Sequence, residues 1–131
     1  MIYLDSSALL KLLFHEDESD SLENWLTIRA GVPTVSSELA KVEVLRACRR
    51  IDTAALPDAR TLLGQLDLVP LAGAVVERAA DLEGPALRNL DALHLASALS
   101  LGADLTAFVA YDHRLLEAAE QAGLETRQPG V

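Results

Sequence analysis

Short apolar runs alternate with longer segments of helical periodicity along this chain. The apolar runs predict strands at 2–4, 34–35, 68–69 and 106–110, with an edge strand at 124–127. Apolar positions spaced three and four residues apart predict helices that end near residues 14 and 29, and further helices over about 38–50, 55–65, 74–82, 91–101 and 112–122.

Capping and turn residues mark the ends of these elements. Ser6 or Ser7 is placed to cap the first helix, and Ser36 or Ser37 to cap the helix over 38–50. Helix stop signals follow at Gly31, Gly84-Pro85, Gly102 and Gly123. Strands that alternate with helices predict an α/β fold, a three-layer α/β/α sandwich around a mainly parallel sheet of four to five strands.

Length and composition suit one domain over residues 1–131. Half of the 131 residues are hydrophobic, so the chain can bury a core without disulfides. Cys48 has no partner for a disulfide and is expected to be a small buried residue. No signal-peptide pattern and no apolar stretch of membrane-spanning length are seen, so we expect a soluble, cytoplasmic protein with no membrane partner.

The net charge of -9 argues against a protein that binds nucleic acid through a generally basic surface. It favours a basic protein partner, or cations that offset clustered carboxylates. One predicted helix nevertheless carries a local basic cluster, formed by Lys41, Arg46, Arg49 and Arg50. This cluster is either a solvated helix face or a rim that holds phosphate groups beside an acidic centre.

Four acidic residues stand where a carboxylate is costly unless it is paired or binds a cation. Asp5 and Asp112 follow predicted strands, Asp91 opens a predicted helix, and Glu43 interrupts the helix after the second strand. Sites in parallel sheets form beyond the carboxyl ends of the strands, at the switch in strand order. The four side chains could therefore meet at one edge of the sheet and form a divalent-metal site.

Each of these carboxylates also has a structural explanation. Asp5, Asp91 and Asp112 could each cap or stabilise the N-terminus of a helix. Glu43 could pair with the arginines one and two turns further along its own helix. The local pattern alone leaves both interpretations open.

The helix over 91–101 carries a polar stripe on an otherwise apolar surface. Its polar residues recur at every third position, at Asp91, His94, Ser97 and Ser100. Such a stripe suggests the wall of a polar pocket. His94 either orients a carboxylate, titrates in the site, or is an ordinary half-buried histidine with its hydrogen bonds satisfied.

The predicted metal ligands are oxygen atoms only. His15 and His113 are expected to be exposed, and they make no metal-ligand spacing with His94. An oxygen-only site points to Mg2+ or Mn2+ rather than to Zn2+.

Four segments, in this order, resemble those of PIN domains. They are residues 2–9 (IYLDSSAL), 36–47 (SSELAKVEVLRA), 90–96 (LDALHLA) and 108–115 (FVAYDHRL). Their order and separation, in a chain of this length, are similar to those of VapC-type toxins of type II toxin-antitoxin systems. The resemblance covers nearly the whole chain, and four segments in order are far more specific than any one of them.

The resemblance implies a PIN-like fold and a Mg2+-dependent endoribonuclease. It implies that the residues matching Asp5, Asp91 and Asp112 hold the metal and that Glu43 completes the quartet. Ser6 matches a small hydroxyl residue that helps to order this centre. The resemblance also implies an RNA substrate, a homodimer, and a small VapB-like antitoxin that neutralises the enzyme by laying a helix over it.

Two positions complicate the pattern. Family members often carry Thr or Ser where this chain has Ala110, so a hydroxyl that would support Asp112 or the substrate is absent. Glu38 is a rival for the role of Glu43. We prefer Glu43 because the Val-Leu-Arg-Ala that follows it fits the family pattern better.

The residue types suit phosphodiester cleavage independently of the resemblance. One or two Mg2+ ions can activate water and clamp phosphate oxygens, provided that the protein supplies carboxylates. We expect Asp5 and Asp91 to be the principal ligands, with Asp112 and Glu43 completing the site directly or through water. Because like charges repel without the ion, at least one of these carboxyls should have a raised pKa.

Two other functions stay open. A metal-dependent phosphatase would normally need a second Asp close to Asp5 and a lysine for the phosphate, and Lys11 is the only lysine nearby. A catalytically silent PIN-like binding module would use its carboxylates as helix caps and its acidity to attract a basic partner.

The first two helices hold more apolar residues than one core stripe needs. These residues are Leu9, Leu10, Leu12, Leu13, Phe14 and Trp25. They either line a groove for the antitoxin or all belong to the core.

Overall fold

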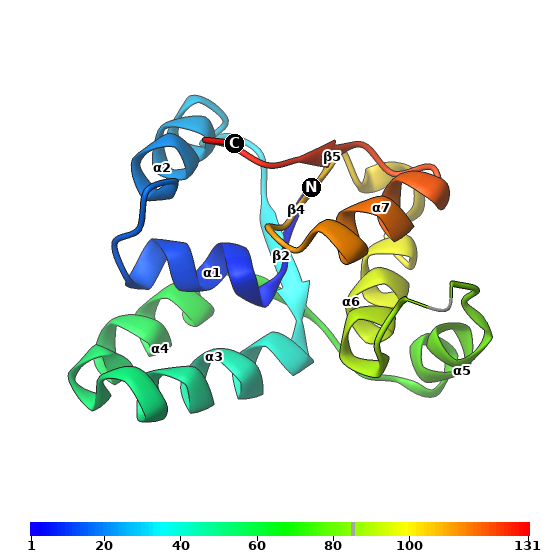
Figure 1. Cartoon of the computed structure of the whole chain (residues 1–131), viewed down its shortest axis with the longest axis horizontal. Coiled ribbons are helices and arrows are strands. Elements are labelled where there is room, and N and C mark those ends of the chain that lie inside the picture. The colour runs from blue at the N-terminus through cyan, green and yellow to red at the C-terminus, as the bar shows by residue number, and fades with distance from the viewer. Residues whose placement is uncertain (85) are drawn as a thin grey trace.

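Five short strands form one sheet at the centre of the molecule, in the order β3-β2-β1-β4-β5, and all of their pairings are parallel (Figure 1). The computed structural model describes residues 1–84 and 86–131, so Pro85 of the predicted stop signal lies outside the described residues. The strands are β1 (Ile2–Leu4), β2 (Thr34–Ser37), β3 (Asp67–Val69), β4 (Ala107–Val109) and β5 (Thr126–Arg127). Each begins and ends within two residues of its predicted bounds.

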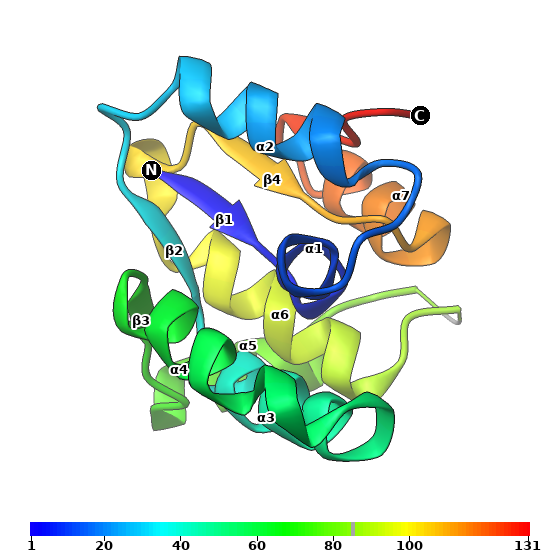
Figure 2. The ribbon, with the colours of Figure 1, turned by 90° about the vertical axis from the view of Figure 1, so that its left-hand side faces the viewer.

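Helices cover both faces of this sheet. They are α1 (Ser6–Leu13), α2 (Ser19–Ile28), α3 (Glu38–Ile51), α4 (Leu56–Gly64), α5 (Gly73–Asp81), α6 (Asn89–Leu99) and α7 (His113–Gln121), with 3-10 turns at Thr53–Ala55 and Gly102–Asp104. Helices α1 to α4 lie on one side of the strands and α5 to α7 on the other (Figures 1 and 2). The predicted three-layer α/β/α sandwich is confirmed.

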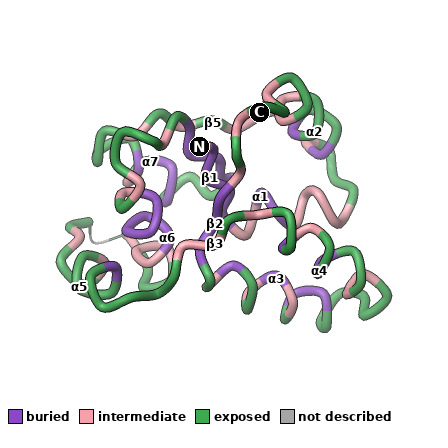
Figure 3. The backbone as a smooth tube through the Cα atoms, turned by 180° about the vertical axis from the view of Figure 1, so that it is seen from behind, coloured by how far each residue is buried: buried purple, intermediate pink, exposed green. Residues whose placement is uncertain are grey.

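The alternation of side chains along β1 divides the core into two halves. Ile2 and Leu4 point into the cluster formed with α1 to α4, whereas Tyr3 points into the cluster formed with α6 and α7. All three side chains are buried, and the buried residues concentrate along the strands and the inner faces of the helices (Figure 3). A continuous apolar run is what a central parallel strand requires, because both of its faces are covered.

One of the two predicted helix caps is wrong. Ser37 caps α3 as predicted, since its Oγ accepts from the backbone N–H of Leu39 at 3.1 Å. Helix α1 is capped by Asp5 and not by Ser6 or Ser7, because Asp5 Oδ1 accepts from the N–H of Ala8 at 3.0 Å. An aspartate at this position satisfies one free N–H of the first turn and also suits the positive end of the helix dipole.

Other predictions from the sequence are confirmed. Cys48 is buried and unpaired. Gly102 and Gly123 follow helices with φ of 56° and 89°, the left-handed conformation that glycine adopts without strain. Within residues 1–84 and 86–131, no helix combines the length and the apolar character needed to cross a membrane.

Candidate functional site

The strand order reverses direction between β1 and β4. From β1 the chain moves outward to β2 and β3, then returns to place β4 on the opposite side of β1. At such a switch point the two connections leave in opposite directions and open a crevice beyond the carboxyl ends of the strands. Asp5 follows β1 directly, and its N–H donates to Val109 O, the last residue of β4, at 3.1 Å. Asp112 begins α7 shortly after β4.

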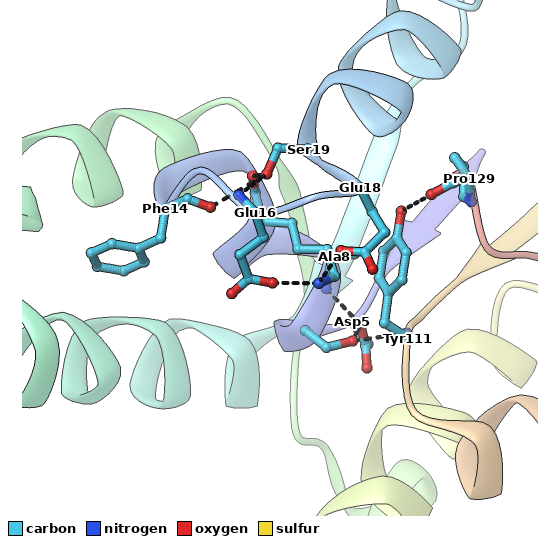
Figure 4. A network of polar contacts seen from close by, with 10 residues as sticks. Asp5, Ala8, Phe14, Glu16, Glu18, Ser19, Tyr111 and Pro129 are labelled. Carbon is cyan, nitrogen blue, oxygen red and sulfur yellow. Dashed lines mark hydrogen bonds and ion pairs between the residues drawn. The ribbon is translucent and has the colours of Figure 1, made fainter. Parts of the chain in front are cut away.

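Asp5 is held by its own helix and by the end of β4. Its Oδ1 accepts from Ser7 Oγ at 2.6 Å and from the Ala8 N–H at 3.0 Å, while Ser7 Oγ accepts from the Tyr111 N–H at 3.0 Å. Figure 4 shows Asp5 between Ala8 and Tyr111 in this network. Tyr111 is fixed in turn by its hydroxyl, which donates to Pro129 O at 2.8 Å.

The second oxygen of Asp5 is left for another partner. Both hydrogen bonds go to Oδ1, and no buried side-chain oxygen in the described part of the chain lacks a partner, so Oδ2 must reach solvent. Burial raises the pKa of Asp5 to about 6, a shift that the charge of Glu43 also favours and that the Ser7 hydrogen bond and His94 oppose. Asp5 is therefore both a helix cap and a costly buried carboxyl.

Glu43 reaches from α3 toward α1 and α6. Its Oε1 accepts from Ser6 Oγ at 2.6 Å and from His94 Nε2 at 2.6 Å. Burial acts to raise the pKa of Glu43, but the hydrogen bonds from His94 and Ser6 outweigh it and the net direction is down. The pairing of Glu43 with arginines of its own helix is not found; the partner is His94, from a different layer of the core.

Glu38 does not share this environment. It is exposed at the start of α3, and its Oε1 accepts from the Leu71 N–H at 3.2 Å, in the chain that follows β3. Glu43 thus contacts His94 and Ser6, whereas Glu38 contacts neither. Ser6, which the resemblance implied as a supporting hydroxyl, donates directly to Glu43 Oε1.

Asp91 and Asp112 form the more open part of the site. Asp91 is half-buried in the first turn of α6. Burial raises its pKa first, and the negative charges of Asp112 and then Glu43 raise it further. Asp112 is exposed and caps α7, with Oδ1 accepting from the Leu115 N–H at 3.0 Å. Burial is thus the main cause of the raised pKa of both Asp5 and Asp91, and repulsion from neighbouring carboxylates adds to it.

The site residues fit a hard divalent cation, but their carboxylates do not form a closed cage. Within residues 1–84 and 86–131, no three His, Cys, Asp or Glu side chains converge closely enough to surround an ion. Mg2+ keeps several water ligands and commonly takes only one or two protein carboxylates, so a closed cage is not needed. The oxygen-only donors and the unbonded Oδ2 of Asp5 suit Mg2+ or Mn2+.

The polar stripe of α6 is only partly a pocket wall. His94 faces Glu43 and is 2% exposed. Ser97 and Ser100 instead donate within their own helix, to Leu93 O at 2.7 Å and to Ser97 O at 2.6 Å. Serine hydroxyls often bond a carbonyl one turn back, which is why a polar stripe alone overestimates the pocket.

Two residues of the site were missed at the sequence level. Tyr3 OH lies 2.7 Å from His94 Nδ1, and Ser7 bridges Asp5 to Tyr111. Tyr3 is a polar-tipped residue between Ile2 and Leu4 in an otherwise aliphatic strand, and a buried hydroxyl needs a partner. That requirement was the available signal for Tyr3, whereas Ser7 was interpreted only as a possible helix cap.

Residues outside the acidic centre behave largely as predicted. His15 and His113 are exposed. The basic cluster of α3 is exposed along its length, at Lys41, Arg46, Arg49 and Arg50. Leu9 belongs to the core, whereas Leu10, Leu12, Leu13, Phe14 and Trp25 are only partly buried against it.

Comparison with known proteins agrees with this architecture. Residues 2–121 match the PIN domain family. The chain is 45% identical over 132 residues to Ribonuclease VapC35 of Mycobacterium tuberculosis, covering 99% of this chain and 98% of the relative.

Two crystal structures have the same fold. One is the sarcin-ricin loop cleaving toxin VapC20 of Mycobacterium tuberculosis (TM-score 0.73, 16% identity, 95% of this chain and 96% of that chain). The other is VapBC2 of Rickettsia felis bound to a DNA fragment from their promoter (TM-score 0.69, 15% identity, 98% of this chain and 99% of that chain). The chain therefore belongs to the PIN-domain family, among its VapC-type members.

Proposed function

We propose that this chain is an endoribonuclease that depends on Mg2+ or Mn2+ and cleaves RNA phosphodiester bonds. The observation that supports the proposal is electrostatic coupling among these acidic residues in a PIN domain: in addition to burial, the charge of Glu43 raises the pKa of Asp5 and of Asp91, and the charge of Asp112 raises the pKa of Asp91. RNA as the substrate class is supported by the ribonuclease name of VapC35 and the cleaving activity named for VapC20.

The roles of the residues follow from their environments. A bound Mg2+ would supply a Lewis acid for the phosphate and a water of lowered pKa. Asp5, through Oδ2, and Asp91 are the principal ligands in this proposal, and Asp112 completes the set from the mouth of the crevice. Glu43, held ionised by His94 and Ser6, either joins the ligands through water or orients the attacking water.

Cleavage of a labelled RNA by the purified chain tests the proposal. We expect cleavage with Mg2+ or Mn2+ and none with EDTA. A generic phosphate monoester serves as the matched substrate, because a phosphatase would turn it over and an endoribonuclease would not. Intact RNA under all metal conditions, with the protein folded, would favour a catalytically silent binding module.

The basic cluster of α3 is the proposed contact for the RNA backbone. Its four side chains are exposed on the helix that also carries Glu43, so phosphates beside the acidic centre would lie within their field. Charge reversal at Arg49 and Arg50 together should weaken RNA binding and reduce its salt dependence, without changing metal affinity.

A VapB-like antitoxin is the proposed protein partner. A surface hollow of about 250 Å3 lies between α1 and α4, lined by Leu12, Leu13, Asp58, Thr61, Leu62 and Gln65. An amphipathic helix with apolar anchors suits such a surface, and the net charge of -9 suits a basic partner. Co-purification with the product of an adjacent small gene, lost on changing Leu12 and Leu13 to polar residues, tests this.

The homodimer stays a proposal as well. Val76 of α5 and Leu90 of α6 are 48% and 50% exposed on two helices that pack together, and each is an apolar side chain that a second copy could cover. Light scattering of the wild type and of a Val76→Glu, Leu90→Glu variant tests it. A dimer that becomes a monomer in the variant would support this face.

A further inference from the structure

A line of buried polar contacts runs from the sheet to the acidic site. It begins at Tyr3 of β1, passes through His94 of α6, and ends at the carboxylate of Glu43 in α3. Tyr3 and His94 are 0% and 2% exposed. We propose that His94 is a positioning residue, which aims the carboxylate of Glu43 into the site and is itself held by Tyr3. The inference deepens the proposed function and depends on the metal site described above.

The Tyr3 end of this line is rigid. The Tyr3 ring stacks on Phe108, its register partner in β4, with ring centroids 5.3 Å apart and planes 4° apart. Against His94 the same ring makes an edge contact at 5.9 Å and 81°. A buried aromatic ring wedged between two partners has a single available rotamer, so its hydroxyl presents a fixed point for the imidazole.

The chemistry of the partners fixes the role of each imidazole nitrogen. An ionised carboxylate only accepts hydrogen bonds, so the 2.6 Å contact to Glu43 Oε1 places a hydrogen on Nε2. The hydroxyl of Tyr3 lies 2.7 Å from Nδ1; it donates to the neutral ring with that tautomer and would accept from the imidazolium. Both nitrogens are thereby used, and neither the ring nor its tautomer can change without leaving a buried group unpaired.

The two carboxylate oxygens of Glu43 have different surroundings. Ser6 and His94 both donate to Oε1, from α1 and α6 respectively. Among the described residues no hydrogen bond is made to Oε2, and because buried side-chain oxygens there all have partners, Oε2 must reach solvent. Rotation of the carboxylate away from His94 would leave Nε2–H with only Ser6 Oγ, at 3.3 Å.

This arrangement exceeds what a structural histidine needs. Any acceptor, including a backbone carbonyl, can satisfy a buried imidazole N–H. The Nε2–H of His94 instead donates to a half-buried carboxylate at the site. Substitution of a residue that hydrogen-bonds a metal-binding carboxylate usually lowers metal affinity or activity by about 10- to 100-fold. The same range is expected here for the loss of the Nε2 contact.

Two amide substitutions separate the contacts of the ring. In His94→Gln the amide nitrogen can take the place of Nε2 and keep the bond to Glu43, while the bond to Tyr3 is lost. In His94→Asn the amide can take the place of Nδ1 and keep the bond to Tyr3, while the bond to Glu43 is lost. Both variants remove the imidazole ring, and each leaves one of its two former partners, Tyr3 or Glu43, without its hydrogen bond to residue 94. We therefore expect similar losses of folding stability in the two variants.

Calorimetric titration of the EDTA-treated full chain with MnCl2 tests the proposal, alongside thermal unfolding without metal. We expect His94→Asn to weaken Mn2+ binding by about 10- to 100-fold, and His94→Gln to stay close to wild type, with similar loss of thermal stability in both. Equal Mn2+ affinity in His94→Asn and wild type, or equal losses in the two variants, would overturn the positioning role.

Tyr3→Phe keeps the test available if the His94 variants do not fold. It preserves the stack on Phe108 and removes only the hydroxyl, so Mn2+ binding should weaken measurably while the fold is retained. Unchanged affinity in Tyr3→Phe would overturn the part assigned to Tyr3. A wild type that neither binds Mn2+ nor cleaves RNA would overturn the proposed function and this inference together. A wild type that cleaves RNA, with a His94→Asn variant whose Mn2+ affinity is unchanged, would overturn the inference alone.

Discussion

The two halves of the acidic site are built differently. Asp5 and Glu43, the anchored pair, each have one oxygen bonded by groups from the core and one oxygen left over. Asp91 and Asp112, the open pair, stand in the first turn of α6 and at the cap of α7, and Asp112 is exposed. Asp91 makes no side-chain hydrogen bond within the described residues, and its pKa is raised by Asp112 after burial.

This difference separates two ways of preparing a cation site. The anchored pair is oriented by hydrogen bonds from Ser7 and Ala8 to Asp5 and from Ser6 and His94 to Glu43. In the open pair the charge of Asp112 raises the pKa of Asp91, and a bound cation would offset this repulsion. A site with one fixed half and one responsive half can keep its geometry at the strand ends and still adjust to a substrate phosphate.

The largest expected effect comes from neutralising the anchored pair. Asp5→Asn keeps an oxygen that can cap α1, because asparagine and aspartate are equally good caps. It removes the charge and the second carboxylate oxygen, so kcat for RNA cleavage at saturating Mg2+ should fall about 100- to 1,000-fold, the usual scale for one preorganised electrostatic group. Initial rates with labelled RNA measure this.

Asp112→Asn is the matched control for that variant. It makes the same chemical change at the exposed cap of α7 and should cost clearly less than Asp5→Asn. Equal losses in the two variants would break the distinction between the pairs. Circular dichroism of both proteins shows whether either loss comes from unfolding.

The next effect is on stability in the metal-free protein. The pKa of Asp5 is raised to about 6, above the value of about 3.9 that an unfolded chain gives it. The folded state therefore binds this proton more tightly, and the resulting stabilisation is full below about pH 4 and is lost as the pH rises through about 6. At about 1.4 kcal/mol per pH unit, the loss is on the order of 3 kcal/mol.

Urea unfolding in EDTA, at several pH values between 4 and 7.5, measures this loss. Asp5→Asn lacks the titrating group, so its stability relative to wild type should rise across this interval. Mg2+ added at pH 7.5 should stabilise the wild type more than the variant, because binding to the folded state alone raises stability. A stability difference that does not change with pH would contradict the raised pKa of Asp5.

Much of this site follows from sequence patterns, because strand ends and helix starts are local properties. Asp5, Asp91 and Asp112 lie next to such ends, and a parallel sheet brings strand ends to one edge. The partner of Glu43 could not be predicted in this way. Its partner His94 lies 51 residues further along the chain, in α6, whereas the helical pattern offers arginines within α3 itself.

Capping was the other limit of local reasoning. Asp5 caps α1 through Oδ1 and leaves Oδ2 without a hydrogen bond, so its role as a cap is compatible with the proposed role as a metal ligand. The hydrogen-bond partner of a serine hydroxyl is also ambiguous in a sequence. The hydroxyl can bond a residue later in the chain, a residue earlier in its own helix, or a residue of another element. Ser7 bonds Asp5 and accepts from Tyr111, whereas Ser97 bonds its own helix.

The smallest expected effect belongs to the open pair. Asp112→Ser keeps an oxygen able to cap α7 and removes the charge beside Asp91, so stability should change by less than about 0.5 kcal/mol. The pKa of Asp91 should move down toward its ordinary value and remain raised, because burial is the larger cause and Asp112 the second. Carbon-detected NMR titration of the Asp91 carboxyl in metal-free protein measures the change.

Asp58→Ser is the matched control, because it removes the same charge from the exposed first turn of α4. It should leave the pKa of Asp91 unchanged. Equal shifts of this pKa in both variants would mean that Asp91 and Asp112 are not electrostatic neighbours.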